Sequence, residues 1–310
     1  MQKTRQAIKD NIARILVGGE KVIDLLLIAL LSQGHVLIED VPGVGKTTLT
    51  QAFARSLDLS FSRIQFTPDV LPSDITGYNL YQLDRQEMVF HPGAIMSHIV
   101  LADEINRSSP KTQSSLLEVM EERQVTVDGI TRPLPRPFMV LATQNPIEFS
   151  GTFPLPEAQL DRFLLKLRLG YPNHQEELAI LQRHLHPPRW QDLEAVMSAA
   201  DVLDLQDKIA EITVSAPVME YIARIVARTR EHESVALGIS PRGSIALMRA
   251  ARARAMLQGR AFVIPDDIQQ LVQSVLQHRL VLRPEAAVSS QAAEQLLRDM
   301  VRLLPVPAVR

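Results

Sequence analysis

A glycine-rich turn that ends in Gly-Lys-Thr is the clearest chemical feature of the chain. The apolar residues 36–38 lead into this turn, and a helical pattern at residues 49–57 follows it. In such a turn, glycines let backbone N–H groups close around phosphate oxygens, lysine neutralises the outer phosphates and threonine ligates Mg²⁺. The helix N-terminus adds its dipole. We therefore predict a phosphate-binding loop formed by Pro42, Gly43, Val44, Gly45, Lys46, Thr47 and Thr48.

One position departs from the usual form of this loop. Asp40 stands where the first glycine of a phosphate-binding loop is normally found. That position opens the loop and lies farther from the phosphates than the Gly-Lys-Thr end. We therefore expect the carboxylate of Asp40 to point away from the phosphates.

Polar residues also follow two other apolar runs. Asp103 and Glu104 come directly after residues 99–102, and Asn145 comes shortly after residues 139–143. Phosphoryl transfer needs a metal ion, positioning and charge neutralisation. We expect one carboxylate of the Asp103-Glu104 pair to bind Mg²⁺ and the other to polarise an attacking water, and we expect Asn145 to hold that water or the γ-phosphate. The alternatives are two solvated carboxylates that open a turn, and an ordinary Asn-Pro turn.

Two arginines are further candidates. Arg162, taken alone, fits a surface arginine paired with Asp161 or Glu157, and such pairs contribute little. Arg242 follows Ser240 and a proline that suits the first turn of a helix. A cation at a helix N-terminus opposes the helix dipole unless an anion lies near it. A phosphate partner is therefore attractive for Arg242, and a solvated arginine is the alternative.

Composition excludes several classes of protein. The chain has 310 residues, a net charge of −2 and no cysteine. This length allows one large or two moderate domains, and the charge gives no general attraction to nucleic acid or anionic membranes. Without cysteine there are no disulfides and no thiolate chemistry. The longest apolar run, residues 22–31, contains Asp24 and is too short to cross a bilayer. We expect a cytoplasmic protein.

The elements that would position these residues alternate between strand and helix in the first half of the chain. Predicted strands lie at residues 35–38, 61–66, 99–102, 139–143 and 163–169, with helical patterns between them. Apolar strands separated by helices indicate a buried parallel sheet. Ligands bind at the carboxyl ends of such strands. We therefore expect the loop, the Asp103-Glu104 pair and Asn145 to converge on one site.

Two insertions and a helical region complete the predicted organisation. Residues 71–92 contain candidate strands at 77–82 and 87–90, and residues 124–130 contain Asp128-Gly129, a strong hairpin signal. Later helices are predicted at residues 201–212, 216–230, 241–258, 265–275 and 290–303. We predict a nucleotide-binding core over residues 1–185 and a helical lid over residues 190–310, with a linker at 186–189.

Taken together, these motifs resemble the MoxR family of AAA+ ATPases over nearly the whole chain. Besides the loop, the likeness rests on Asp103-Glu104-Ile105-Asn106-Arg107, on Ala142-Thr143-Gln144-Asn145-Pro146, and on Gly151-Thr152-Phe153-Pro154-Leu155-Pro156-Glu157-Ala158-Gln159-Leu160-Asp161-Arg162-Phe163. Only the loop is common to all P-loop NTPases. The resemblance implies an α/β P-loop NTPase fold of the AAA+ type. The implied fold has a parallel five-stranded sheet flanked by helices, followed by a C-terminal all-α lid domain.

The resemblance also implies a role for each candidate residue. Lys46 and Thr47 would be the Walker A residues, Asp103 and Glu104 Walker B, Asn145 sensor 1, Arg162 the arginine finger and Arg242 sensor 2, while Val17 and Gly18 resemble the segment that cradles adenine. The implied cofactors are ATP and Mg²⁺. The implied assembly is a hexameric ring in which the neighbouring copy's Arg162 completes each site.

Family members act as chaperone-like machines, often with partners that bear a von Willebrand factor A domain, and they assemble complexes or mature metal centres. The two hairpins correspond to insertions shared with magnesium-chelatase ATPase subunits.

Three functions remain open at this point. The first is an ATP-driven remodelling enzyme, the second a nucleotide-gated assembly scaffold, and the third a magnesium-chelatase-like or DNA-acting helicase-clade motor. The presence of both Glu104 and Arg162 favours real ATP turnover. The hairpin around Asp128 has no lysine or arginine at its tip, which argues against DNA. We expect an ATP hydrolase with protein partners and no nucleic-acid partner.

Overall fold

A five-stranded parallel sheet forms the centre of the molecule. The computed structural model describes residues 1–41, 43–84, 86–145, 151–185, 189–289 and 291–307. The strand order is β2-β5-β8-β1-β9, and every neighbouring pair is parallel. The strands are β1 (Val36–Glu39), β2 (Phe61–Gln65), β5 (Ile99–Asp103), β8 (Met139–Gln144) and β9 (Leu165–Leu167). All five predicted strands are present, although β9 is shorter than predicted.

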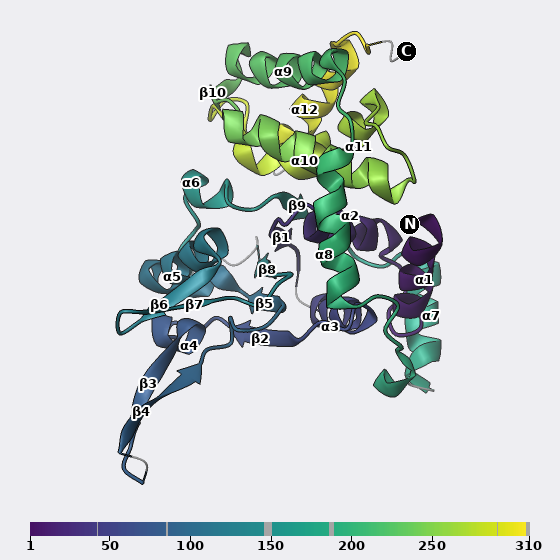
Figure 1. The fold of residues 1–310 in the computed structure, drawn as a ribbon. Helices are drawn as coiled ribbons and strands as arrows, with labels where there is room; N and C mark the ends of the chain where they lie inside the picture. Colours follow the sequence, from purple (N-terminus) through teal and green to yellow (C-terminus); the bar gives the residue numbers. More distant parts are fainter. Residues whose placement is uncertain (42, 85, 146–150, 186–188, 290, 308–310) are drawn as a thin grey trace.

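Helices cover both faces of this sheet, as Figure 1 shows. The helices α1 (Gln2–Ala13), α2 (Glu20–Leu31) and α3 (Lys46–Ser56) pack on one face, and α5 (Pro110–Glu122) packs on the other. All of β5 is buried, and β8 is buried until its last residue. Because both faces are covered, the strands are continuously apolar and polar residues appear only where the strands leave the core.

Two antiparallel hairpins extend from the core. One consists of β3 (Gly77–Gln82) and β4 (Glu87–Pro92), which follow the short helix α4 (Pro72–Thr76) and project from the body of the molecule (Figure 1). The other consists of β6 (Gln124–Val127) and β7 (Ile130–Pro133). Its turn residues Asp128 and Gly129 have positive φ angles of 50° and 77°, as the predicted two-residue turn requires. Asn79 Nδ2 donates to Asp128 Oδ2 at 2.7 Å, so the hairpins touch.

The second half of the chain is mainly helical. It contains α7 (His174–Leu185), α8 (Ala199–Lys208), α9 (Ala216–Glu231), α10 (Pro241–Leu257), α11 (Pro265–Leu276) and α12 (Ala292–Leu303), with the short helix α6 (Glu157–Leu160) before them. A small antiparallel pair, β10 (Val235–Leu237) with β11 (Val281–Leu282), was not predicted, because segments this short leave no periodic pattern.

The helical region and the sheet share one apolar cluster. Residues of α2, α8 and α10 belong to the same buried cluster as one face of the sheet, and Gln206 Nε2 donates to the Leu30 carbonyl at 2.7 Å. The predicted division into core and lid stays a prediction, and linker residues 186–188 lie outside the described residues. No helix among the described residues combines the length and apolar character needed to span a bilayer.

Candidate functional site

The predicted phosphate-binding loop joins β1 to α3. Gly43 and Gly45 have φ angles of 86° and 85°, a region that residues with a side chain rarely adopt. A Cβ on Gly45 would also lie 3.1 Å from Leu16 Cδ1. The helix α3 begins at Lys46, so its first-turn amides face the loop. Pro42 lies outside the described residues.

Asp40 is turned away from the loop, as predicted. Its side chain is buried, and Oδ2 accepts hydrogen bonds from the backbone N–H groups of Leu169 at 2.6 Å and Gly170 at 2.8 Å. Oδ1 accepts from the N–H of Val41 at 2.9 Å. The carboxylate therefore ties the entrance of the loop to the segment after β9 and keeps its charge from the phosphate positions.

Lys46 reaches back over the loop and keeps its charge unpaired. Its Nζ donates to the carbonyl oxygens of Asp40 at 3.2 Å and Val41 at 3.3 Å, and it forms no ion pair within the described part of the chain. The ammonium faces a cleft of about 390 Å³, which we call the phosphate cleft. It is lined by Gly43, Gly45, Lys46, Thr47, Thr48, Arg63, Gln65, Asp103 and Glu104.

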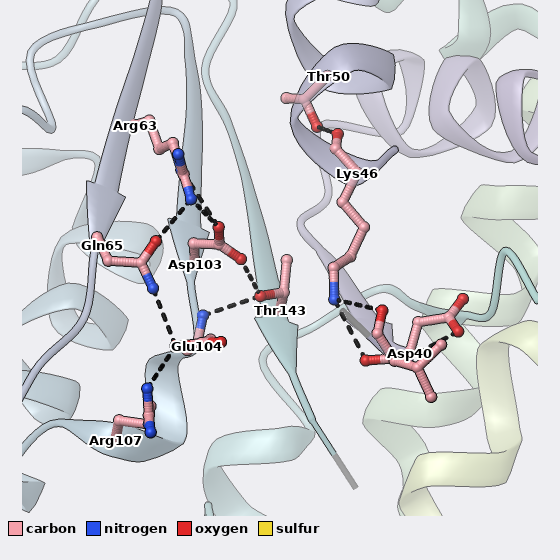
Figure 2. Close-up of polar contacts among 10 residues, drawn as sticks. Asp40, Lys46, Thr50, Arg63, Gln65, Asp103, Glu104, Arg107 and Thr143 are labelled. Atoms are coloured by element: carbon pink, nitrogen blue, oxygen red, sulfur yellow. Dashed lines mark hydrogen bonds and ion pairs between the residues drawn. The ribbon is translucent and has the colours of Figure 1, made fainter. Parts of the chain in front are cut away.

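The two predicted carboxylates line this cleft and diverge from each other (Figure 2). Asp103 Oδ1 accepts from the Thr143 hydroxyl at 2.6 Å, and the same hydroxyl accepts from the backbone N–H of Glu104 at 2.8 Å. Glu104 has a φ of 57°, in the left-handed region, so the chain turns sharply at the end of β5. Its Oε2 accepts from Arg107 at 3.1 Å and from Gln65 at 2.9 Å.

The structure adds two residues of β2 that the sequence analysis missed. Arg63 donates from its terminal nitrogen to Asp103 Oδ2 and to Gln65 Oε1, each at 2.6 Å. Because Gln65 also donates to Glu104, one hydrogen-bonded chain links both carboxylates (Figure 2). The available signal was an arginine and a glutamine at alternate positions of a predicted strand, which places both on one side of the sheet edge.

Asn145 lies at the same edge of the sheet. It follows β8 directly, and β8 lies between β5 and β1. The backbone N–H of Asp40 donates to the Gln144 carbonyl at 3.1 Å, which places the start of the loop beside the end of β8. Asn145 is 7% exposed. The strand ends therefore bring the loop, the carboxylate pair and Asn145 to one edge, and the role of Asn145 stays a prediction.

A larger pocket of about 630 Å³ adjoins the loop, and we call it the base pocket. It is lined by Val17 and Gly18, by loop residues that include Val44 and Thr48, and by residues after β9. Its volume suits a small organic ligand. Gly18 has a φ of 75°, and a Cβ there would lie 2.5 Å from Glu176 Oε1. Val17 and Gly18 thus line a pocket beside the loop, and their contact with a base stays a prediction.

Arg162 and Arg242 lie together, but away from the loop. They line a third cavity, of about 280 Å³, which we call the arginine pocket. Arg162 Nε lies 3.2 Å from Glu121 Oε2, and an Arg242 terminal nitrogen lies 3.2 Å from Glu121 Oε1. Neither arginine lines the phosphate cleft or the base pocket.

The alternative of a surface pair of Arg162 with Asp161 or Glu157 is not observed, and the hydroxyl of Ser240 makes no capping hydrogen bond among the described residues. Arg162 pairs with Glu121 instead, because it points toward the end of α5, where its Nη1 also donates to the Leu117 carbonyl at 2.6 Å. The Ser240 hydroxyl lies 3.5 Å from Asp161 Oδ2.

The phosphate cleft fits a nucleotide with Mg²⁺. The hydroxyl of Thr47 and the carboxylate of Asp103 line the same cleft and offer the oxygen ligands that Mg²⁺ prefers. Protein sites hold Mg²⁺ through one or two carboxylates together with phosphates and waters. Among the described residues, no group of three or more His, Cys, Asp or Glu side chains offers another metal site.

Comparison with known proteins shows which family the chain resembles. Residues 35–165 match the ATPase family associated with various cellular activities (AAA), and residues 227–300 match the AAA lid domain. Chaperone MoxR1 of Mycobacterium tuberculosis (strain ATCC 25618 / H37Rv) is 43% identical over 309 residues, 96% of this chain and 81% of that protein. YeaC of Bacillus subtilis (strain 168) is 54% identical over 303 residues, 97% and 94% of the two chains.

Two further relatives extend the comparison. Protein MoxR of Methylorubrum extorquens is 32% identical over 325 residues, 96% of this chain and 93% of that protein. The crystal structure of a Cytophaga hutchinsonii protein superposes with a TM-score of 0.92 at 37% identity, covering 99% of this chain and 96% of the other. The chain therefore belongs to the MoxR family of AAA+ ATPases.

Proposed function

We propose that this protein is an ATP hydrolase that works as an oligomeric ring, a hexamer by analogy with its family. It couples Mg-ATP binding and hydrolysis to chaperone-like remodelling or assembly of a partner protein. One observation carries the proposal: the phosphate cleft and the arginine pocket are lined by different residues of one chain. Each region is half of a hydrolytic site, and a second copy of the chain supplies the other half.

In this proposal, the residues of the phosphate cleft have separate roles in nucleotide binding and hydrolysis. The loop amides and Lys46 hold the phosphates, while Thr47 and Asp103 hold Mg²⁺. When bound, Mg²⁺ neutralises charge on the phosphate oxygens. Glu104 orients the attacking water, and Asn145 holds the water or the γ-phosphate. Gln65 and Arg107 both donate to Oε2 of Glu104. Among the contacts of the described residues, Oε1 is therefore the oxygen that can orient the water.

The neighbouring copy supplies two cations. Arg162 and Arg242 contact the same carboxylate, so they form one unit that reaches a phosphate together. A guanidinium delivered in this way neutralises charge that develops in the transition state. It is worth about 10³–10⁵ in rate in related enzymes. Turnover therefore depends on assembly, and the isolated subunit binds ATP but hydrolyses it slowly.

The partner is inferred from relatives and from the family. One relative is named a chaperone, which supports remodelling of another protein. By family analogy we propose that this protein works in the cytoplasm, with a partner that bears a von Willebrand factor A domain and a role in complex assembly or metal-centre maturation. The two projecting hairpins are the natural elements to contact it.

Mixing two inactive variants tests the shared site. Arg162→Ala subunits retain Glu104, and Glu104→Gln subunits retain Arg162. In a mixed ring, an interface between the two can combine an intact Glu104 with an intact Arg162. We expect each variant alone to be inactive and the mixture to recover part of the ATPase activity. The control mixes the double variant Glu104→Gln/Arg162→Ala with Arg162→Ala, which restores no intact interface. Mixed rings that form without recovering activity would contradict the proposal.

A further inference from the structure

The arginine pocket carries an excess of positive charge. It lies between the end of α5, the segment after α6 and the start of α10. Five arginines line it, namely Arg123, Arg162, Arg242, Arg249 and Arg279. Two carboxylates face them, Glu121 and Asp161. Five positive charges against two negative ones leave a pocket that favours an anion of more than one charge.

Asp161 is already engaged by a buried partner. Arg279 Nε donates to Asp161 Oδ1 at 2.6 Å, and Arg279 is 8% exposed. Burial lowers the pKa of Arg279, and the contact with Asp161 partly restores it. This pair joins the helical region to the core. It leaves Glu121 as the remaining carboxylate that lines the pocket.

The deeper arginines have neutral partners. Arg123 donates to Gln33 Oε1 at 2.5 Å and to the Gln33 carbonyl at 2.8 Å, and Arg249 donates to the Ser32 carbonyl. Partial burial lowers the pKa of Arg123, and the charge of Arg249 lowers it further. Their positive charges are therefore not balanced within the pocket.

Glu121 contacts Arg162 and Arg242 as a phosphoryl group would. Each of its two carboxylate oxygens lies 3.2 Å from a different arginine. Paired oxygens of a carboxylate and of a phosphate meet guanidinium groups in similar ways. The Glu121 side chain is 40% exposed, so it can exchange its partners for water at little cost. Arg162 also donates to the Leu117 carbonyl at 2.6 Å, a contact that does not involve Glu121.

We propose that the arginine pocket is an anion-binding site with Glu121 as its resident anion. The incoming ligand is the terminal phosphate of a nucleotide held by the neighbouring copy, and it displaces Glu121. This inference rests on the proposed function, in which Arg162 and Arg242 act across an interface. Glu121 holds the two guanidinium groups together in the free subunit, and its release makes interface formation dependent on a bound triphosphate.

The substitution Glu121→Gln tests the proposal, because it keeps the shape of the side chain and removes its charge. The measurement is ATP-driven assembly by sedimentation velocity, in a Glu104→Gln background that prevents hydrolysis. We expect assembly at a protein concentration about two- to tenfold lower, since two half-exposed ion pairs no longer compete with the phosphate. Glu122→Gln is the matched control, because this neighbouring exposed glutamate does not line the pocket.

A second variant links the effect to Arg162. In an Arg162→Ala background, Glu121→Gln should shift assembly less, because one of the two ion pairs is already gone. Unchanged or weaker assembly of Glu121→Gln, with a normal thermal unfolding curve, would overturn the inference. The proposed function is judged separately, by whether Arg162→Ala abolishes turnover and by the mixing experiment.

Discussion

The phosphate cleft and the arginine pocket differ in the partners of their cations. In the phosphate cleft, Lys46 donates to two backbone carbonyls and forms no ion pair with any described residue, while the carboxylates are held by Thr143 and by Arg63 and Gln65 of β2. In the arginine pocket, Arg162 and Arg242 share one carboxylate, that of Glu121. Within the described residues, the phosphate cleft therefore holds a lysine without an ion pair and two carboxylates that are fixed by hydrogen bonds. The arginine pocket has several cations and a single exchangeable anion.

This difference indicates that the two regions meet their ligand in different ways. In the proposed function, the phosphate cleft takes a nucleotide from solution, because Lys46 forms no ion pair with a described residue. The arginine pocket has to release an internal contact before it can bind. In the proposed ring, a site divided in this way would couple catalysis to the contact between copies. The predictions below test the division, from the largest expected effect to the smallest.

Removing Arg162, the proposed arginine finger, should lower the rate of ATP hydrolysis but leave ATP affinity nearly unchanged. For Arg162→Ala we expect kcat to fall by about 10³-fold or more. The ATP affinity of the unassembled subunit should change by about twofold at most, because Arg162 lines neither the phosphate cleft nor the base pocket of its own chain. Steady-state hydrolysis and titration with a fluorescent ATP analogue measure the two quantities. A large loss of affinity would place Arg162 in its own chain's site and break the comparison.

Removing Lys46 from the phosphate cleft should, in contrast, weaken ATP binding itself. For Lys46→Ala we expect ATP affinity to fall about 100-fold, the loss of two charge-assisted hydrogen bonds. Titration calorimetry with Mg²⁺ measures it. Lys208→Ala is the control, since this exposed lysine pairs with Asp204 on α8. Equal ATP affinity for Lys46→Ala and the parent protein would refute the loop assignment.

Acid should lower the stability of the protein through His35, which lies between the arginine pocket and the sheet. His35 lines this pocket, accepts from the Val140 N–H at 3.0 Å and lies 3.0 Å from the Met120 carbonyl. Burial lowers its pKa to about 4 from 6.5. The unfolded chain therefore binds the proton more readily, so stability is complete above pH 6.5 and falls as the pH drops toward 4.

Equilibrium unfolding in urea measures this effect. Between pH 7.5 and 4.5 we expect His35 to reduce the free energy of unfolding by about 2–3 kcal/mol. The variant His35→Asn keeps an acceptor for Val140 and should lose less stability over the same range. An equal loss in both proteins would assign the pH dependence to other groups, among them the buried His278, whose pKa burial also lowers.

The smallest effect on activity is expected for Arg63, which donates hydrogen bonds to the carboxylate of Asp103. For Arg63→Gln we expect kcat to fall about tenfold, because residues that orient metal ligands typically affect activity 10- to 100-fold. Stability should change by about 1 kcal/mol at most, since Arg63 is half-exposed. The Mg²⁺ dependence of ATP-analogue binding is the second measurement, and Arg224→Gln on α9 is the control. An unchanged kcat would show that Asp103 needs no support from β2.

Much of the fold follows from local patterns. The five strands, both hairpins and the helices α9, α10 and α11 were predicted to within a few residues. Buried parallel strands require continuous apolar runs, and the Asp128-Gly129 turn requires positive φ at both residues. The small β10–β11 pair was missed for the same reason, because three and two residues are too few to show a pattern.

The candidate site was only half predictable. The loop and the Asp103-Glu104 pair carry local signatures, since each follows directly on an apolar run. Arg63 and Gln65 act on residues some forty positions away. Their alternate spacing indicates that they share one side of the sheet, but it does not identify the carboxylates that they contact. Glu121 looks like any charged residue at the end of a helix. Its contact with Arg242 spans 121 positions.

The sequence by itself determined which groups can bind a triphosphate, because amide-rich turns and strand-end carboxylates are specified by neighbouring residues. Tertiary structure alone decided that Arg162 and Arg242 share Glu121 and lie away from the loop of their own chain. The physical reason is the distance along the chain over which each kind of interaction acts. Steric and periodic preferences act over a few residues, whereas the meeting of charges from separate helices depends on how the whole chain packs.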